Sequence, residues 1–255
     1  MHSNEALHYF QQEGLVELLP VEDEAIKVDV FDNVSGKVTT PLPPDSEDLV
    51  RIHQLIRKRK SFTVLEFGTG FSTMVIADAL RKNKLDWDNL KDKPEIRNNH
   101  MFHCFTVDTS EKWIATAKGR VPRDLSEYVS FYFSTVEIGT FNGQLCHYYK
   151  NLPDIVPDFI YLDGPDPKSV SGSINGLTFQ PDERTVMAAD LLLMESTFLP
   201  GTFILVDGRT NNARFLKNNF KREYIFNWNP IEDITTFELK EDRLGMYNVL
   251  GSDFF

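Results

Sequence analysis

The chain has 255 residues, of which 41% are hydrophobic and 25% are charged, and its formal net charge is −11 at pH 7. This size and composition are typical of a globular α/β domain with additions, and the acidic balance argues against nonspecific binding to nucleic acid. No apolar run approaches the roughly 20 residues that a membrane span requires, and residues 1–5 lack the features of a signal peptide.

The two cysteines, Cys104 and Cys146, both lie in apolar runs that are typical of strands. Buried free thiols of this kind are characteristic of a reducing compartment. We therefore expect a cytoplasmic protein without disulfides, and we expect neither a nucleic-acid partner nor a membrane partner.

The N-terminal part is predicted to be an extension, residues 1–60, to a larger domain formed by residues 61–255. Residues 3–19 have the apolar spacing of a short helix, interrupted by a glycine. Residues 25–40 alternate around three valines and predict a small hairpin. Three prolines then mark a boundary, and residues 46–60 return to the pattern of a helix with a basic C-terminal end.

A strand, a glycine turn and the start of a helix are predicted between residues 62 and 80. The run from Phe62 to Phe67 is apolar and β-branched apart from Glu66, which is typical of a buried strand. Gly68 and Gly70 follow, and without a Cβ they allow a ligand to rest on the backbone. The next helix would point unpaired N–H groups at that ligand.

Further along the chain, predicted strands alternate with helices, which favours a parallel sheet with helices on both faces. Strands are expected at 101–107, 128–133, 158–162 and 202–206, and helices at 110–120, at 182–197 and from Asp207 to Phe220.

Four stretches depart from this alternation. The dipeptide Asn142-Gly143 between two strand-like arms predicts a hairpin over 136–149. Residues 83–100 and 164–180 are expected to be surface loops, the second a candidate lid. Short runs at 222–228, 234–239 and 246–250 lack connections of helix length, so we expect antiparallel edge strands.

Acidic residues stand at the ends of four predicted strands: Glu66, Asp108, Asp163 and Asp207. Ligands of open α/β sheets bind beyond the carboxyl ends of the strands, where these side chains should meet. Asp108 has two interpretations, since it could accept hydrogen bonds from both hydroxyls of a ribose or could cap the helix at 110–120. Glu66 would repel a pyrophosphate and attract a cationic amino group or a sulfonium.

The pattern Glu66-Phe67-Gly68-Thr69-Gly70, with Asp108 and Asp163 after later strands, resembles the motifs of class I S-adenosylmethionine (SAM) dependent methyltransferases. The local form Glu-x-Gly-x-Gly-x-Ser-Thr, with Leu-Asp-Gly at 162–164 and Pro200, Gly201 and Asp207, is similar to the branch that methylates small molecules and sugars. This resemblance covers about residues 60–220. It implies a Rossmann-like, doubly wound and mostly parallel sheet with antiparallel edge strands.

The resemblance also implies roles for individual residues. Glu66 would contact the methionine amino group of SAM, Asp108 its ribose, and Ser134 and Thr135 its adenine. Asp163 would lie beside the methionine end and is the first candidate for a catalytic base. The remaining expected cofactor contacts are Gly68, Thr69, Gly70, Ser72 and Thr109. The acceptor is expected to be a small molecule or a saccharide that is methylated at oxygen.

Alternatives to these assignments remain open. A nicotinamide oxidoreductase on the same fold is one, although Thr73 replaces the third glycine of a dinucleotide-binding turn. A non-catalytic interaction protein is another. His147 is a second base candidate, with a structural role favoured. A divalent cation held by Asp163, Asp207 and Asn212 is not favoured, because Gly208 departs from the metal-binding pattern and Asn212 is more simply a helix-cap residue.

Overall fold

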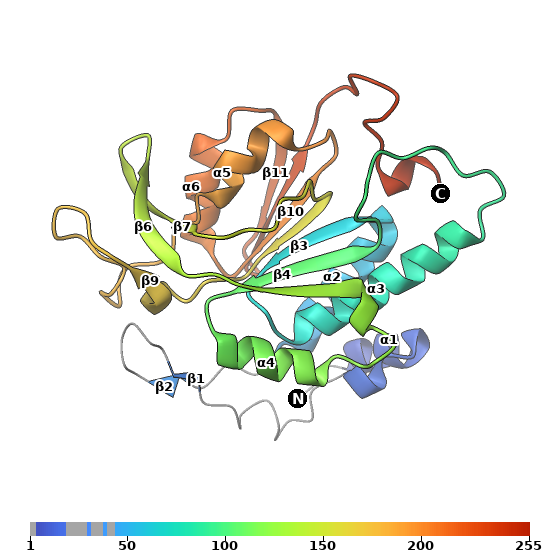
Figure 1. Cartoon of the computed structure of the whole chain (residues 1–255), viewed down its shortest axis with the longest axis horizontal. Helices are drawn as coiled ribbons and strands as arrows, with labels where there is room; N and C mark the ends of the chain where they lie inside the picture. The colour runs from blue at the N-terminus through green and yellow to red at the C-terminus, as the bar shows by residue number, and fades with distance from the viewer. Residues whose placement is uncertain (1–3, 19–29, 32–37, 40–43) are drawn as a thin grey trace.

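A computed structural model describes residues 4–18, 30–31, 38–39 and 44–255, and its centre is a seven-stranded sheet (Figure 1). The strand order is β11-β12-β10-β8-β3-β4-β5. Five strands are parallel, whereas β12 runs antiparallel to both β10 and β11. The bounds are β3 (Thr63–Phe67), β4 (His103–Asp108), β5 (Val129–Phe133), β8 (Phe159–Leu162), β10 (Phe203–Asp207), β11 (Tyr224–Asn229) and β12 (Ile234–Leu239).

Helices cover both faces of this sheet. On one face, α2 (Ser46–Arg59) and α3 (Phe71–Asp88) pack against β3, β8 and β10 in one apolar cluster, and α4 (Glu111–Arg120) lies beside α3. On the other, α5 (Asp190–Met194) and α6 (Thr210–Asn219) share a second cluster with the opposite side chains of the same strands. The predicted Rossmann-like, doubly wound and mostly parallel fold with antiparallel edge strands is confirmed.

The central strands could be predicted because most of their residues are apolar. All five residues of β3 and all four of β8 are buried, as expected for central parallel strands that are covered on both faces. The predicted hairpin is formed by β6 (Val136–Phe141) and β7 (Gln144–Tyr149), with positive φ angles at Asn142 and Gly143. It replaces the helical crossover between β5 and β8, and β9 (Val170–Ser171) adds to it in parallel.

The N-terminal part begins with α1 (Asn4–Glu13), and Gly14 in the left-handed region separates it from the short 3-10 helix η1 (Val16–Leu18). The strands β1 (Val30–Phe31) and β2 (Val38–Thr39) pair antiparallel, as the predicted hairpin requires. The turn expected at 33–36 lies outside the described residues. The described residues form four further 3-10 helices: η2 (Ser126–Tyr128), η3 (Pro167–Ser169), η4 (Glu195–Thr197) and η5 (Gly251–Asp253).

Three predicted elements are corrected by the structure. The helix expected over 182–197 forms only from Asp190, because residues 187–189 are extended and hydrogen-bond to β7 through His147. Helix α3 continues to Asp88 rather than ending near Lys82, and Trp87 in its last turn packs on Phe62. The run at 246–250 is not a strand, because its end packs beside Gly201 and the C-terminal end of α2 instead of along a sheet edge.

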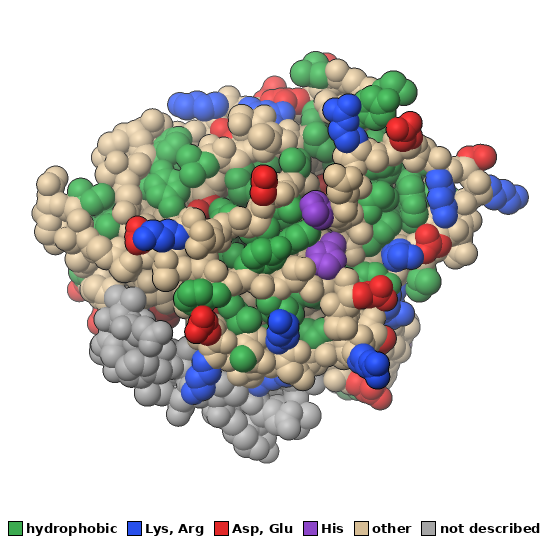
Figure 2. Space-filling view, in the orientation of Figure 1, with side chains coloured by type: hydrophobic (Ala, Val, Ile, Leu, Met, Phe, Trp, Pro, Cys, Tyr) green, Lys and Arg blue, Asp and Glu red, His purple; other side chains and the backbone are tan. Residues whose placement is uncertain are grey.

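On the face of the molecule seen in Figure 2, acidic and basic side chains are interspersed with apolar clusters rather than gathered by sign. Among the described helices, none combines the length and the apolar character needed to cross a bilayer.

Candidate functional site

The four strand-end acids lie on four neighbouring strands. In the order β10, β8, β3 and β4, the sheet carries Asp207, Asp163, Glu66 and Asp108. Glu66 pairs with Thr106 and with Tyr161 on its two neighbours, so its strand is central to the group. The carboxyl ends of parallel strands meet at one edge of the sheet, and the fold therefore brings these residues together as predicted.

Glu66 is fully buried, and it holds the start of α3 in place. Its two carboxylate oxygens accept hydrogen bonds from the hydroxyls of Ser72 at 2.5 Å and Thr73 at 2.7 Å. The Thr73 hydroxyl also accepts a bond of 3.1 Å from the Gly70 N–H. Burial raises the pKa of Glu66 to about 7, and the two hydroxyl hydrogen bonds act in the opposite direction. A nearby cation would favour the charged carboxylate.

Asp108 is half-buried and joins β4 to the glycine turn. One carboxylate oxygen accepts from the backbone N–H of Thr69 at 2.9 Å, and the other from that of Ser110 at 2.8 Å. The cap of α4 is Ser110, whose hydroxyl accepts from the N–H of Trp113. Burial raises the pKa of Asp108 in spite of these bonds. An ionised carboxylate can accept about four hydrogen bonds over its two oxygens, so Asp108 can accept from a ligand as well.

The glycine turn leaves backbone open on one side. Gly68 has a φ of +95°, and its backbone packs against that of Asp163 and Gly164, so a Cβ there would lie 3.2 Å from their atoms. A Cβ on Gly70 would meet nothing closer than the Ser72 hydroxyl at 3.9 Å. Gly68 therefore serves the packing of β3 against β8, whereas the space beside Gly70 is free for a ligand.

Asp163 is the most open of the strand-end acids, with 53% of its side chain exposed. Its carboxylate lies 3.5 Å from the guanidinium of Arg209, which also donates to the carbonyls of Asp163 and Pro165. Asp207, at the end of β10, accepts a hydrogen bond of 2.6 Å from the Tyr161 hydroxyl. Asp163 is thus held in place by Arg209 while one side of it remains accessible.

The residues expected at the adenine lie next to Asp108. The backbone N–H of Ser134 donates to the carbonyl of Asp108 at 3.0 Å. Ser134 is buried, and its hydroxyl donates to the carbonyl of Thr135 and accepts from the N–H of Asn151. Thr135 is exposed and Thr109 is half-buried. The side chains of Thr135 and Thr109 are therefore accessible to a ligand. The buried Ser134 instead holds the backbone after β5 in place through its hydrogen bonds.

Two further residues lie at this edge, and the sequence alone did not predict a role for either. The indole N–H of Trp113 on α4 donates to the carbonyl of Thr69, across 44 positions of sequence. Arg209 links the loops after β8 and β10. Neither carries a local signal, except that Arg209 follows the Asp207-Gly208 pair that ends a predicted strand.

The side chain of Asn212 is buried on α6, whereas Asp163 is open to solvent. Among the residues that the structure describes, no group of three or more His, Cys, Asp or Glu side chains is arranged to hold a metal ion.

No protein-family model matches the sequence, and no curated protein matches it. Several solved structures are similar in fold. An O-methyltransferase, TomG from Streptomyces achromogenes in complex with SAM, is 16% identical, with 94% of this chain and 97% of that chain covered and a TM-score of 0.46. The SAH-bound methyltransferase PaMTH1 of Podospora anserina is 11% identical, with 94% and 89% covered and a TM-score of 0.47. An O-methyltransferase from Bacillus cereus in complex with SAH is 14% identical, with 94% and 93% covered and a TM-score of 0.43.

Proposed function

We propose that the chain is a SAM-dependent methyltransferase that acts on an oxygen of a small-molecule or saccharide acceptor. One observation carries this proposal. The open backbone beside Gly70 lies between Glu66 and Asp108, on adjacent strands at the carboxyl edge of the sheet. This combination of a free space and carboxylates suits an adenosyl compound that carries positive charge, and it would repel a pyrophosphate.

The residues present fit the cofactor in three places. The space beside Gly70 and the first turn of α3 would take the methionine end, with Glu66 and Ser72 below it. Asp108 would accept hydrogen bonds from the ribose hydroxyls. Thr109 and Thr135 would border the adenine. Bound SAM would supply a methyl group on a positively charged sulfur, already activated for displacement.

The chain's own contribution is then to orient the acceptor and to receive its proton. Holding two reacting groups in line can lower a barrier by roughly 7–11 kcal/mol. Asp163 is our candidate for the base, because it is exposed and Arg209 fixes its position. The Asp163 carboxylate would accept the proton that the acceptor hydroxyl loses.

We further propose that the N-terminal extension, residues 1–60, borders the acceptor side of the site. Its helix α2 begins at this edge of the sheet: burial, and after it the negative charge of Asp207, raise the pKa of Asp48 in the first turn to about 6. Cys104 and Cys146 are both free and buried, which supports our proposal of a reducing, cytoplasmic location.

Asp108→Ala tests the assignment of the ribose site. We expect it to weaken the binding of SAM more than tenfold, measured by calorimetry, because two hydrogen bonds to a charged carboxylate are lost. The matched control is Asp92→Ala, which removes an exposed acid from the loop after α3. Unchanged affinity in Asp108→Ala would reject the ribose assignment.

A further inference from the structure

The strand β11 forms one outer edge of the seven-stranded sheet, next to β12. The Lys240 N–H donates to the carbonyl of Glu223, directly before the strand, at 2.8 Å. In an antiparallel pair, hydrogen-bonded residues alternate with residues whose N–H and C=O groups point away. Tyr224, Phe226 and Trp228 therefore direct their backbone groups outward. Within the described part of the chain, none of these three N–H groups has an acceptor.

Both ends of this outward row are closed. The outward position before it is Arg222, whose backbone N–H donates to the Glu195 carboxylate at 2.9 Å. The outward position after it is Pro230, which has no N–H. The open part of the edge therefore runs from Tyr224 to Trp228 and is symmetric about Phe226.

β11 also lacks the features that usually protect an exposed edge. Native edge strands carry charges, prolines or bulges that prevent pairing with another chain. The six residues of β11 are Tyr-Ile-Phe-Asn-Trp-Asn, without a charge or a proline. The side chains of Ile225 and Trp228 are 52% and 46% exposed. The ring of Phe226 packs on Phe237 of β12 and holds the strand in place. The edge is thus suited to the addition of a further strand.

We propose that β11 is the interface of a symmetric dimer, in which it pairs antiparallel with β11 of a second copy. The two-fold axis passes through Phe226, so that Tyr224 faces Trp228 of the second copy. Each outward N–H then donates to a carbonyl across the axis, which gives three intermolecular hydrogen bonds from each copy. A contact that uses the same surface on both chains closes the assembly at two chains.

The limits of the open edge point to a copy of the same chain as the partner. Pairing about Phe226 places Arg222 opposite Pro230 of the second copy. Neither of these positions has an N–H to leave unpaired, so the pairing ends at the same point on both strands. The aromatic side chains of Tyr224 and Trp228 then form two cross-strand pairs, and pairs of this kind stabilise antiparallel strands.

The charges that flank β11 favour the antiparallel arrangement. The exposed Lys221 precedes the strand, and the exposed Glu232 and Asp233 follow it. Antiparallel pairing brings the start of one strand beside the end of its copy, so Lys221 approaches these acids of the second copy. Glu223 faces the uncharged Asn229 of the second copy. Exposed pairs add little stability, but they help to select the orientation of the partner.

Sedimentation velocity of the full chain over a dilution series tests the dimer. One chain has a mass of 29.4 kDa, and we expect a species of twice that mass at micromolar concentration. Trp228→Pro should raise the dissociation constant of the dimer at least a hundredfold. The Trp228 N–H takes no part in the ladder to β12, and an edge strand tolerates proline at such a position. Circular dichroism shows whether the variant is folded.

Two further variants separate the backbone from the side chain. Trp228→Ala keeps the N–H and removes only the indole, so we expect it to raise the dissociation constant about tenfold, less than the proline does. Leu85→Ala is the control. Leu85 is 51% exposed on α3, which packs against the central strands of the sheet, and the dissociation constant should stay within about twofold.

A cysteine mixture tests the register. Pairing about Phe226 places Ile225 opposite Asn227 of the second copy, and both side chains are exposed. Their Cα atoms would be about 4.5 Å apart, which permits a disulfide. Ile225→Cys mixed with Asn227→Cys should form an intermolecular disulfide under mild oxidation, and neither variant should do so alone. The native Cys104 and Cys146 are buried and do not interfere.

A monomeric wild type, or a dimer whose dissociation constant Trp228→Pro leaves unchanged, would overturn the proposal. Cross-linking of one cysteine variant alone would reject the axis at Phe226. If the proline variant does not fold, the cysteine mixture decides: a disulfide formed only in the mixture supports the interface, and its absence rejects it. These measurements need neither cofactor nor acceptor, so their outcome is independent of the proposed function.

Discussion

Gly70→Val is expected to weaken the binding of SAM by at least a hundredfold while the protein stays folded. The Gly70 backbone is extended, with a φ of −167°, so a side chain is tolerated there. The added Cβ would meet only the Ser72 hydroxyl, at 3.9 Å. A valine would instead occupy the free space beside the turn, where we place the methionine end of the cofactor. Calorimetry gives the affinity, and thermal unfolding reports on the fold.

The choice of glycine decides whether this experiment is informative. Gly68→Val would place a β-branched residue at a φ of +95° with backbone atoms 3.2 Å away, and is expected to destabilise the protein itself. Gly119→Val on α4 is a suitable control, because its added Cβ would have no atom within 4 Å. Tight binding of SAM by Gly70→Val would show that the cofactor is not held at this turn.

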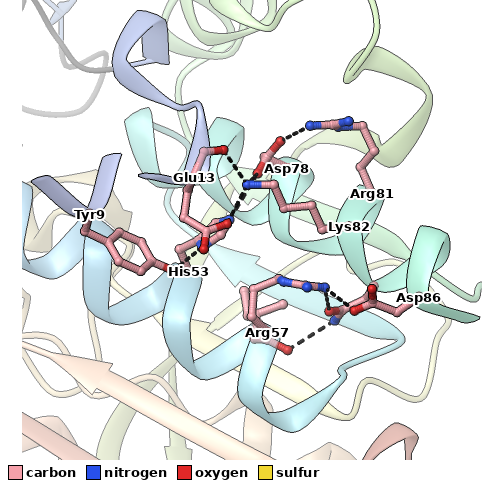
Figure 3. A network of polar contacts seen from close by, with 10 residues as sticks. Tyr9, Glu13, His53, Arg57, Asp78, Arg81, Lys82 and Asp86 are labelled. Carbon is pink, nitrogen blue, oxygen red and sulfur yellow. Dashed lines mark hydrogen bonds and ion pairs between the residues drawn. The ribbon is translucent and has the colours of Figure 1, made fainter. Parts of the chain in front are cut away.

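Asp78→Ala is expected to have the largest effect on stability, because it removes the centre of a buried polar network (Figure 3). Asp78 on α3 is paired with Arg81 at 2.5 Å and Lys82 at 2.9 Å, and one of its oxygens lies 3.1 Å from His53 Nε2. Only 2% of the Asp78 side chain and none of the His53 side chain is exposed.

This network fastens α1 to the rest of the fold. The hydroxyl of Tyr9 on α1 is 2.6 Å from Nδ1 of His53 on α2. Lys82 on α3 donates to both the carbonyl and the carboxylate of Glu13 at 2.7 Å (Figure 3). The pairing holds the pKa of Asp78 well below its usual range. Removing Asp78 would leave His53 and Lys82 without their shared acceptor.

We expect Asp78→Ala to lower the free energy of unfolding by about 3–5 kcal/mol, the usual cost of removing one partner from a buried ion pair. Urea denaturation followed by circular dichroism measures it. Asp88→Ala on the same helix breaks exposed pairs with Lys84 and Lys93, and should cost at most about 0.5 kcal/mol. Similar losses in the two variants would mean that the buried network does not stabilise the fold.

The sequence predicted most of the sheet because the relevant signals are local. Central parallel strands form continuous apolar runs, and β3 and β8 are buried at every position. The Asn142-Gly143 turn specifies its hairpin through two positive φ angles. The strand-end acids could be placed together, because the ends of parallel strands meet at one edge whatever the loops do.

The features that escaped prediction depend on contacts far apart in the chain. Residues 187–189 have a composition compatible with a helix, yet they are extended because their backbone groups pair with His147 on β7. Trp113 and Arg209 act through carbonyl groups of distant loops, which no residue pattern reveals. The burial of Glu66 behind Ser72 and Thr73 likewise depends on how α3 docks at the glycine turn.

The central claim is that the glycine turn beside Glu66 and Asp108 binds an adenosyl compound. The most direct test is a calorimetric titration of the wild-type chain with S-adenosylhomocysteine and, under the same conditions, with NAD. We predict saturable binding of S-adenosylhomocysteine and no heat beyond dilution for NAD, since the Glu66 carboxylate stands at the turn where a pyrophosphate would lie. Binding of NAD without binding of the adenosyl thioether would contradict the account and would instead support an oxidoreductase on this fold.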